Sequence, residues 1–199
     1  MRLALTVSAA VMALSVPALA QEAAAPAAQA QVQAQAPMAG QFTRAELTTF
    51  HAAMERVTPI AQAANGAPSA DQQAQMAAAI EAEGLTVDRF NAISAAVAGD
   101  PVLQARLAVI AAPAPAAGSP AASVTDQEVQ AAARATAQIR DLGIQGTPTA
   151  EQAEAMGAAV QSAGLTIERF NEIATAARSA DQLRARLALA EARMSASEG

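Results

Sequence analysis

Hydrophobic residues recur every three or four positions along most of the chain, a spacing typical of amphipathic helices. In the first such stretch they are Leu47, Phe50, Met54, Val57 and Ile60. No stretch alternates hydrophobic and polar residues in the way that predicts a strand. The pattern therefore predicts an all-α protein built of short helices.

Polar residues and glycines mark the ends of these expected helices. Five helix starts combine a Ser or Thr with a Glu or Gln three positions later, which is the capping-box pattern: Thr43, Ser69, Thr125, Thr149 and Ser179. Thr86 and Thr166 are expected to cap further helices. Gly84 and Gly164 precede them and suit the left-handed position that follows a helix. Asp100 precedes Pro101, a residue that favours the first position of a helix.

The segment from Gly84 to Ile93 returns as Gly164 to Ile173. Without gaps, residues 84–112 and 164–192 share 14 identities in 29 positions, most of them other than alanine. The first helices of the two copies align with an offset of 82 and everything after Gly66 with an offset of 80, so the second copy lacks two loop residues. The sequence predicts two tandem copies of a unit of about four short helices, either as two linked domains or as one pseudo-symmetric bundle.

The amino terminus has the pattern of a signal peptide. Met1 and Arg2 form a short basic start, residues 3–16 are apolar, and Ala18-Leu19-Ala20 fits the small-residue rule for cleavage between Ala20 and Gln21. The apolar run is shorter than the roughly 18–20 residues of a membrane span. We therefore expect a periplasmic or secreted protein without a membrane span in the mature chain.

The segments expected from these patterns follow in one order along the chain. They are a signal peptide (1–20), a disordered Ala/Gln/Pro leader (21–41), helical repeat 1 (42–111), an Ala/Pro linker (112–123), helical repeat 2 (124–194) and a tail (195–199).

Composition narrows the classes of function. The mature chain has 11 Arg (12 less Arg2) against 18 Asp and Glu, a net charge of −7, and it lacks Lys, Trp and Tyr. Such a chain offers neither the basic patch nor the stacking aromatics that nucleic-acid binding needs. Most of the hydrophobic content is alanine, which buries little area, so each unit of roughly 70 residues is near the lower limit for a core of its own. We expect the two copies to support each other by packing together.

The repeated core Gly-Leu-Thr-[Val/Ile]-[Asp/Glu]-Arg-Phe-Asn-x-Ile resembles the bacterial domain of unknown function 4168. The upstream Thr-x-x-Glu start and the downstream Leu-x-x-Arg-Leu helix share the resemblance, which covers residues 43–111 and 125–194. It implies small exported helical proteins of unassigned activity, and it supplies no catalytic residue. The second copy departs from the pattern where Ala132 replaces Phe50.

Arg89, Asn91, Arg169 and Asn171 are the candidate interaction surface. They flank the core phenylalanine of each copy, so they point away from the core. One interpretation is a paired Arg/Asn surface for an anionic or peptide partner. The other is structural: each Arg pairs with a carboxylate such as Glu83 or Asp88, and each Asn bonds loop backbone. Arg106 and Arg186 are expected to pack their stems along the bundle.

No catalytic or metal-binding pattern is found in the sequence. His51 is the sole histidine and cysteine is absent, which leaves no credible zinc spacing and no base for a serine nucleophile. The methionines 54, 76 and 156 lie at core spacing. We expect no cofactor and no enzyme activity.

Two functions remain open at this point. The first is an exported, non-enzymatic helical interaction or structural protein of the cell envelope, whose partner would be another envelope protein. The alternative is a periplasmic helical binding protein for a small apolar or anionic ligand.

Overall fold

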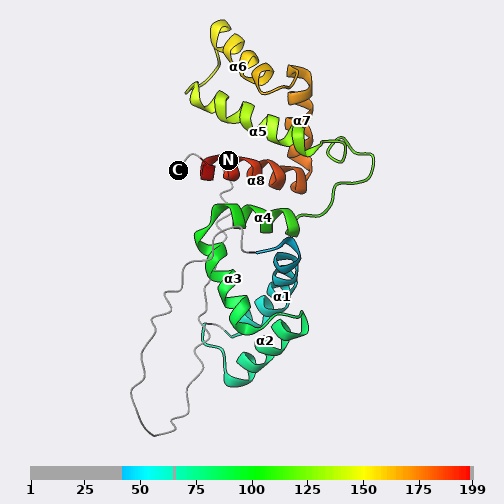
Figure 1. Ribbon diagram of the computed structural model, residues 1–199, viewed down its shortest axis with the longest axis vertical. Coiled ribbons are helices and arrows are strands. Elements are labelled where there is room, and N and C mark those ends of the chain that lie inside the picture. The colour runs from blue at the N-terminus through cyan, green and yellow to red at the C-terminus, as the bar shows by residue number, and fades with distance from the viewer. Residues whose placement is uncertain (1–41, 65, 198–199) are drawn as a thin grey trace. The chain divides into compact units, whose positions relative to one another are not determined.

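The computed structural model describes residues 42–64 and 66–197, which form eight helices and no strand (Figure 1). The all-α prediction is confirmed for this part of the chain. The expected signal peptide (1–20) and leader (21–41) lie outside the described residues. The helices are α1 (Arg44–Ala63), α2 (Ala70–Ala82), α3 (Val87–Gly99), α4 (Pro101–Ala111), α5 (Asp126–Asp141), α6 (Ala150–Ser162), α7 (Ile167–Ser179) and α8 (Asp181–Ser197).

Most of the hydrogen bonds at the helix starts are those that the sequence predicts. Four of the five expected capping boxes form, with the Ser or Thr side chain accepting from the N3 amide and the N3 side chain accepting from the cap amide. The box expected at Ser179 was wrong: Ser179 is the last residue of α7, and its hydroxyl donates to the Ala176 carbonyl at 3.3 Å. Thr86 and Thr166 cap α3 and α7. Gly84 and Gly164 follow α2 and α6 with φ of +86° and +93°. These helix ends are therefore fixed by residues within a few positions of each other.

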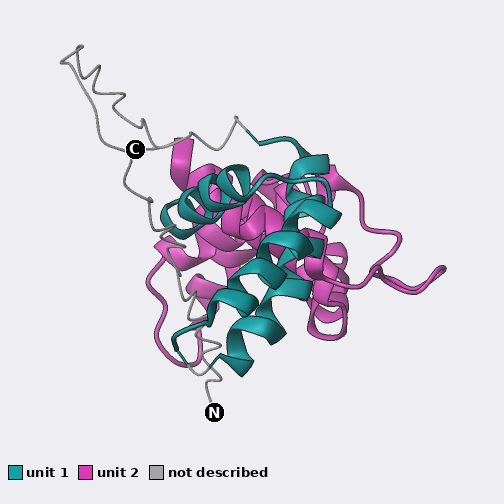
Figure 2. Ribbon diagram, turned by 90° about the horizontal axis from the view of Figure 1, so that it is seen from below, with its two compact units in different colours: residues 1–100 teal, residues 101–199 magenta. Residues whose placement is uncertain are grey.

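The chain divides into two compact units, residues 1–100 and 101–199, which Figure 2 colours separately. In the first unit, α1 packs on α2 and α3. The rings of Phe50 and Phe90 lie 4.9 Å apart between centroids, and both side chains are buried. Leu47, Ile80 and Ile93 are fully buried. An aromatic pair surrounded by aliphatic side chains is therefore the core of this unit.

The second unit, which comprises α4 to α8, has a different kind of core. Here α5 packs on α6 and on α8, and it buries alanines on more than one of its sides: Ala131, Ala132, Ala133 and Ala135. Small side chains let helix axes approach closely, and the larger residues of this core come from α6, α7 and α8, such as Val160, Ile173 and Leu183. Ala132 is itself buried, so the loss of the phenylalanine found at Phe50 leaves a close-packed helix contact rather than an exposed gap.

The division between the units falls at residues 100 and 101, before α4. The sequence places α4 at the end of repeat 1 (42–111), yet the helix belongs to the second unit, where it packs on α8. Asp100 has extended backbone (φ −122°, ψ 108°), which ends α3 and begins a new helix at Pro101. This break allows α4 to pack independently of α3.

Two expectations need correction. The tail expected at 195–199 begins as helix, because α8 continues to Ser197 and the hydroxyls of Ser195 and Ser197 bond the carbonyls of Glu191 and Met194. Met54 lies at core spacing but is 37% exposed. Ala53 is buried instead, so the buried side of α1 runs through Leu47, Phe50 and Ala53, each three positions apart.

Candidate functional site

One arginine on α3 and one on α7 pair with the capping-box glutamates of α1 and α5, respectively. In the first unit, Arg89 contacts Glu46 Oε1 through Nη2 at 2.5 Å and Nε at 3.1 Å. In the second, Arg169 Nε lies 2.7 Å from Glu128 Oε1. The expected partners Glu83 and Asp88 were wrong: Glu83 pairs with Arg56 at 2.6 Å. The structural interpretation of the two arginines is therefore correct in kind, with a different carboxylate.

Each glutamate of these pairs is held on both of its oxygens. Glu46 Oε2 accepts from the Thr43 amide at 2.8 Å and from its hydroxyl at 2.9 Å, while Oε1 faces Arg89. The hydrogen bond from the Thr43 amide, and next that from Arg89, lower the pKa of Glu46 from 4.5 to about 2. All of these donors favour the ionised carboxylate. The cap and the bridge between α1 and α3 thus depend on one charge.

The glutamate of the second unit is held in the same manner. The hydrogen bond from Arg169, and next that from the Thr125 amide, lower the pKa of Glu128 from 4.5 to about 2. Arg169 Nη1 also lies 2.9 Å from Glu172 Oε2, and its hydrogen bonds to Glu128 and then Glu172 raise the pKa of its guanidinium. Because both Glu128 and Glu172 already pair with it, the Arg169 guanidinium stabilises the fold and is not available to a binding partner.

Further arginine contacts fix the segment that precedes each first helix. The Arg89 guanidinium lies 4.6 Å from the centroid of the buried Phe42 ring, a cation–π arrangement. In the second unit, Arg186 donates to the Val124 carbonyl at 3.0 Å and to Asp126 at 2.7 Å. Sequence reasoning missed Phe42 and Val124. The available signal was a hydrophobic residue before each capping Thr, the hydrophobic-staple position.

The two asparagines of the candidate surface, unlike the arginines, have no side-chain partner among the described residues. Asn91 is half-buried and Asn171 is exposed. Neither side chain has a hydrogen-bond partner among the residues that the structure describes. Asn91 and Arg89 belong to the first unit, and Asn171 and Arg169 to the second. The asparagines, rather than the arginines, are the polar groups left available for binding.

Asn171 lines a groove of the second unit. A groove of about 1080 Å³ lies between the linker (113–123) and one side of α7. Its α7 wall carries Glu168, Arg169, Asn171, Glu172, Thr175 and Ser179, and its linker wall carries Pro113, Pro115 and Pro120. Because Arg169 is neutralised by its two carboxylates, the polar wall presents amide, hydroxyl and acidic groups. An anionic partner is disfavoured here, whereas donors of a peptide backbone or a cationic side chain fit.

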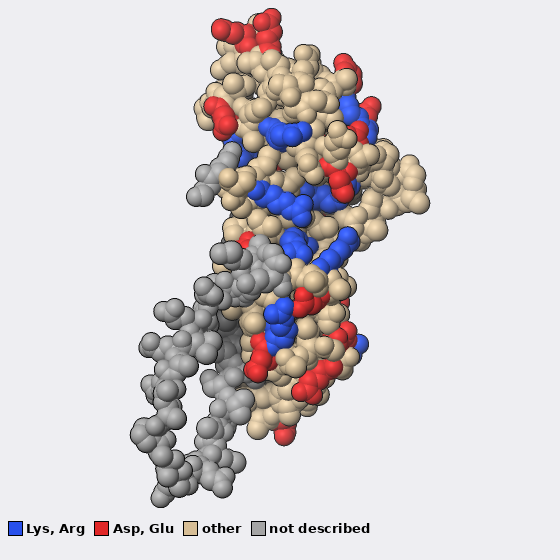
Figure 3. Space-filling view, in the orientation of Figure 1, with Lys and Arg blue, Asp and Glu red and all other residues tan. Residues whose placement is uncertain are grey.

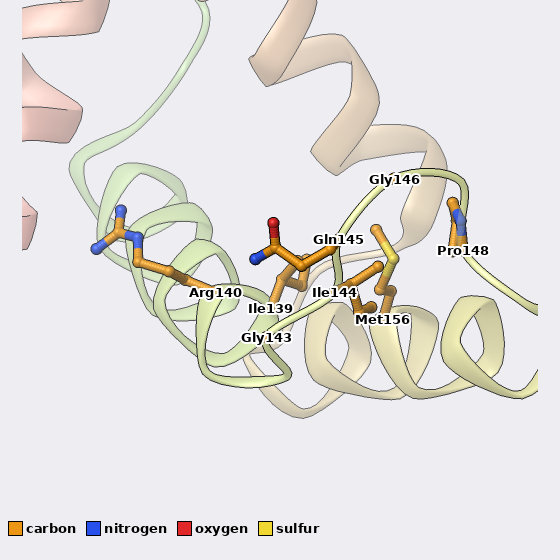
Figure 4. Close-up of a pocket in the computed structure, with 8 residues that line it drawn as sticks. All are labelled: Ile139, Arg140, Gly143, Ile144, Gln145, Gly146, Pro148 and Met156. Carbon is orange, nitrogen blue, oxygen red and sulfur yellow. The ribbon is translucent and has the colours of Figure 1, made fainter.

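A smaller cavity of about 380 Å³ lies at the loop between α5 and α6 (Figure 4). Its lining comprises Ile139, Arg140, Gly143, Ile144, Gln145, Gly146, Pro148 and Met156. In Figure 4 Met156 lies beside Ile144, while the Arg140 guanidinium points away from them. Arg140 pairs with Glu191 at 3.3 Å. The chemistry of this cavity is therefore apolar at Met156 and Ile144, with no arginine directed at it.

Charge is distributed unevenly over the second unit. Arginines gather over α5 and α8, and carboxylates mark the end formed by α6 (Figure 3). The residues of these helices agree with this: α6 carries Glu151 and Glu154 without an arginine, and α8 carries Arg184, Arg186 and Arg193.

Within residues 42–64 and 66–197, no group of three or more His, Asp or Glu side chains lies close enough to hold a metal ion. In the same residues no single helix is long and apolar enough to span a membrane. The helices α3 and α4 together meet the length and composition of a span, but the chain bends by 111° between them.

Residues 12–107 match a family described as a domain of unknown function (DUF4168). The match covers most of the first repeat and ends within α4, so the second repeat is linked to the family only through its internal likeness to the first. Comparison with curated proteins and with solved structures gives no match.

Proposed function

We propose that the protein is an exported, non-enzymatic helical module of the cell envelope, and that the groove along α7 is where it binds another protein. The observation that carries this proposal is the position of Asn171. It is exposed, has no partner among the described residues, and lies in a groove large enough for an extended peptide. Arg169, by contrast, already has Glu128 and Glu172 as partners.

The chemistry of the groove indicates what kind of partner fits. Asn171 can donate and accept, as a peptide backbone requires, and Thr175 and Ser179 add hydroxyls. Glu168 adds a carboxylate on the same wall. A polypeptide segment with free backbone groups and a Lys or Arg side chain matches this set.

Site-specific photo-crosslinking in intact cells tests the proposal. A photoreactive residue at position 171 should capture one defined envelope protein, whereas the same residue at Gln130, an exposed position of α5 outside the groove, should not. Equal capture at both positions, or none at 171, would contradict the proposal. Export is tested separately by sequencing the amino terminus of the mature protein, which should begin at Gln21.

A second function is favoured by the cavity beside the α5–α6 loop. Its volume, about 380 Å³, falls within the range of small-molecule sites, and Met156 and Ile144 give it an apolar side. A small apolar ligand would fit there. Native mass spectrometry of the protein purified from the periplasm should then show one bound molecule per chain, absent from an Ile144→Asp variant. A spectrum of the bare chain only would exclude this function.

A further inference from the structure

The two helices α4 and α8, which hold equivalent places in the two repeats, pack on each other within the second unit. Leu103 and Leu183 are the matched buried residues, 0% and 1% exposed. Every position from 101 to 109 has the same burial as its counterpart from 181 to 189, whether buried, half-buried or exposed. The helices run antiparallel (Figure 1). Equivalent faces meeting in opposite directions form a self-complementary contact.

Such a contact has a consequence for association. In isologous dimers the same patch of two chains meets itself about a two-fold axis. Here α8 already accepts a helix that is its sequence equivalent, with Leu103, Arg106 and Leu107 matching Leu183, Arg186 and Leu187. The α4 of a second copy carries the identical face. The α4 of the second copy could therefore pack on α8 and bury the same residues as the α4 of the same chain does.

The connection after α4 permits this exchange. Residues 112–125 form no helix, and most of those from 113 to 120 are exposed, with only Ala121 and Val124 of the connection buried. Residues 113–120 are rich in alanine and proline and contain no Leu, Ile, Val, Met or Phe. A change of path there leaves the buried contacts of α4, α5 and α8 intact.

We propose that two copies of this chain form a dimer by exchange, in which α4 of each copy pairs with α8 of the other and residues 113–120 act as the hinge. The exchanged dimer retains every helix contact of the second unit, because each α8 still covers an α4. Only the path of the hinge differs between the two forms. The helix that packs on α8 in the exchanged form comes from a second copy of this chain, because the α4 of that copy is identical to the one already packed there. Another protein would have to reproduce the same face.

Hinge length provides the test. If the connection between α4 and α5 is too short, α4 cannot reach α8 of the same chain, which disfavours the monomer. The exchanged dimer is then the form that keeps the α4–α8 contacts. We expect a chain that lacks residues 113–120 to raise the ratio of dimer to monomer by on the order of tenfold or more, measured by light scattering after size-exclusion chromatography. The matched control replaces the same eight positions with Gly and Ser and keeps the length, and it should behave as the parent chain.

A second measurement on the parent chain covers the case in which the shortened chain fails to fold. Light and heavy isotopic copies are mixed at high concentration, and native mass spectrometry should find mixed dimers that persist after dilution, because separation requires the α4–α8 pairing to open. A folded but monomeric shortened chain would overturn the proposal. So would parent copies that form no mixed dimer, or that separate at once on dilution.

Discussion

Arg169 on α7 reaches Glu128 on α5, 41 positions earlier in the chain, with 2.7 Å between Nε and Oε1. The same carboxylate accepts from the Thr125 amide at 2.8 Å through its other oxygen. One glutamate thus completes the cap of its own helix and fastens a second helix to it. Arg89 and Glu46 repeat this arrangement in the first unit.

Removal of the Arg169 guanidinium should destabilise the protein. The pair is partly buried, with the two side chains 27% and 25% exposed. We expect Arg169→Ala to lower the free energy of unfolding by about 1 kcal/mol, since exposed pairs contribute less and fully buried ones more. Urea unfolding measures the change. A double-mutant cycle that combines Arg169→Ala with Glu128→Gln should show a stabilising coupling energy between the two side chains.

The control for this cycle is Arg193→Ala. Arg193 is an exposed arginine of α8 with no ion pair to a described residue. Its substitution should change stability by less than about 0.5 kcal/mol. If both arginine variants unfold at the same urea concentration, the pair with Glu128 contributes nothing.

Stability should fall in acid because of Glu46 and Glu128. The pKa of each carboxyl is about 2 in the folded protein, below its ordinary value of 4.5. The unfolded chain therefore binds protons first, and the stabilisation present above pH 4.5 is lost as the pH falls from there toward 2. The loss should be on the order of 1 kcal/mol per carboxyl after allowance for partial exposure to solvent.

Urea midpoints measured between pH 7 and pH 2.5 check this dependence. A chain with both Glu46→Gln and Glu128→Gln should be less stable at pH 7 and lose less stability on acidification than the parent. An unchanged acid dependence in this double variant would assign the effect to other carboxylates.

The aromatic pair of the first unit should not transfer to the second. The rings of Phe50 and Phe90 are in contact at a tilt of 39°, whereas the equivalent Ala132 is 2% exposed among the buried alanines of α5. Ala132→Phe should overfill this contact and destabilise by about 1–3 kcal/mol, while Phe50→Ala should leave a cavity and cost about 3–5 kcal/mol. Thermal unfolding followed by circular dichroism compares the two. A stabilising Ala132→Phe would show that the core around Ala132 has room for a ring.

Two glycines should respond oppositely to alanine. Gly164 has φ of +93°, a conformation that strains any residue with a side chain, although a methyl group there would meet no atom within 4 Å. We expect Gly164→Ala to destabilise by roughly 1–2 kcal/mol. Gly99 ends α3 without a positive φ and also has open space. Gly99→Ala should be neutral or slightly stabilising, and equal losses at both sites would refute the backbone argument.

Much of the fold was predictable because it depends on neighbouring residues. The capping boxes at Thr43 and Thr125 join atoms three positions apart, and the glycine at 164 ends a helix by its own conformational freedom. Of the candidate site, the sequence identified Arg169 and Asn171. It did not identify Glu128 as the partner, since any nearby carboxylate satisfies the same chemical rule.

By itself the sequence determined an all-α chain, most of its helix starts and the likeness of its two halves, because periodicity, caps and glycines act over a single helical turn. Only the tertiary structure decided which distant groups meet. Arg169 and Glu128 lie 41 positions apart, and α4 and α8 carry equivalent faces, so no local pattern indicates that α4 packs on α8. Contacts between chemically equivalent surfaces are selected by the packing of the whole unit, in which the break at Asp100 frees α4 from α3.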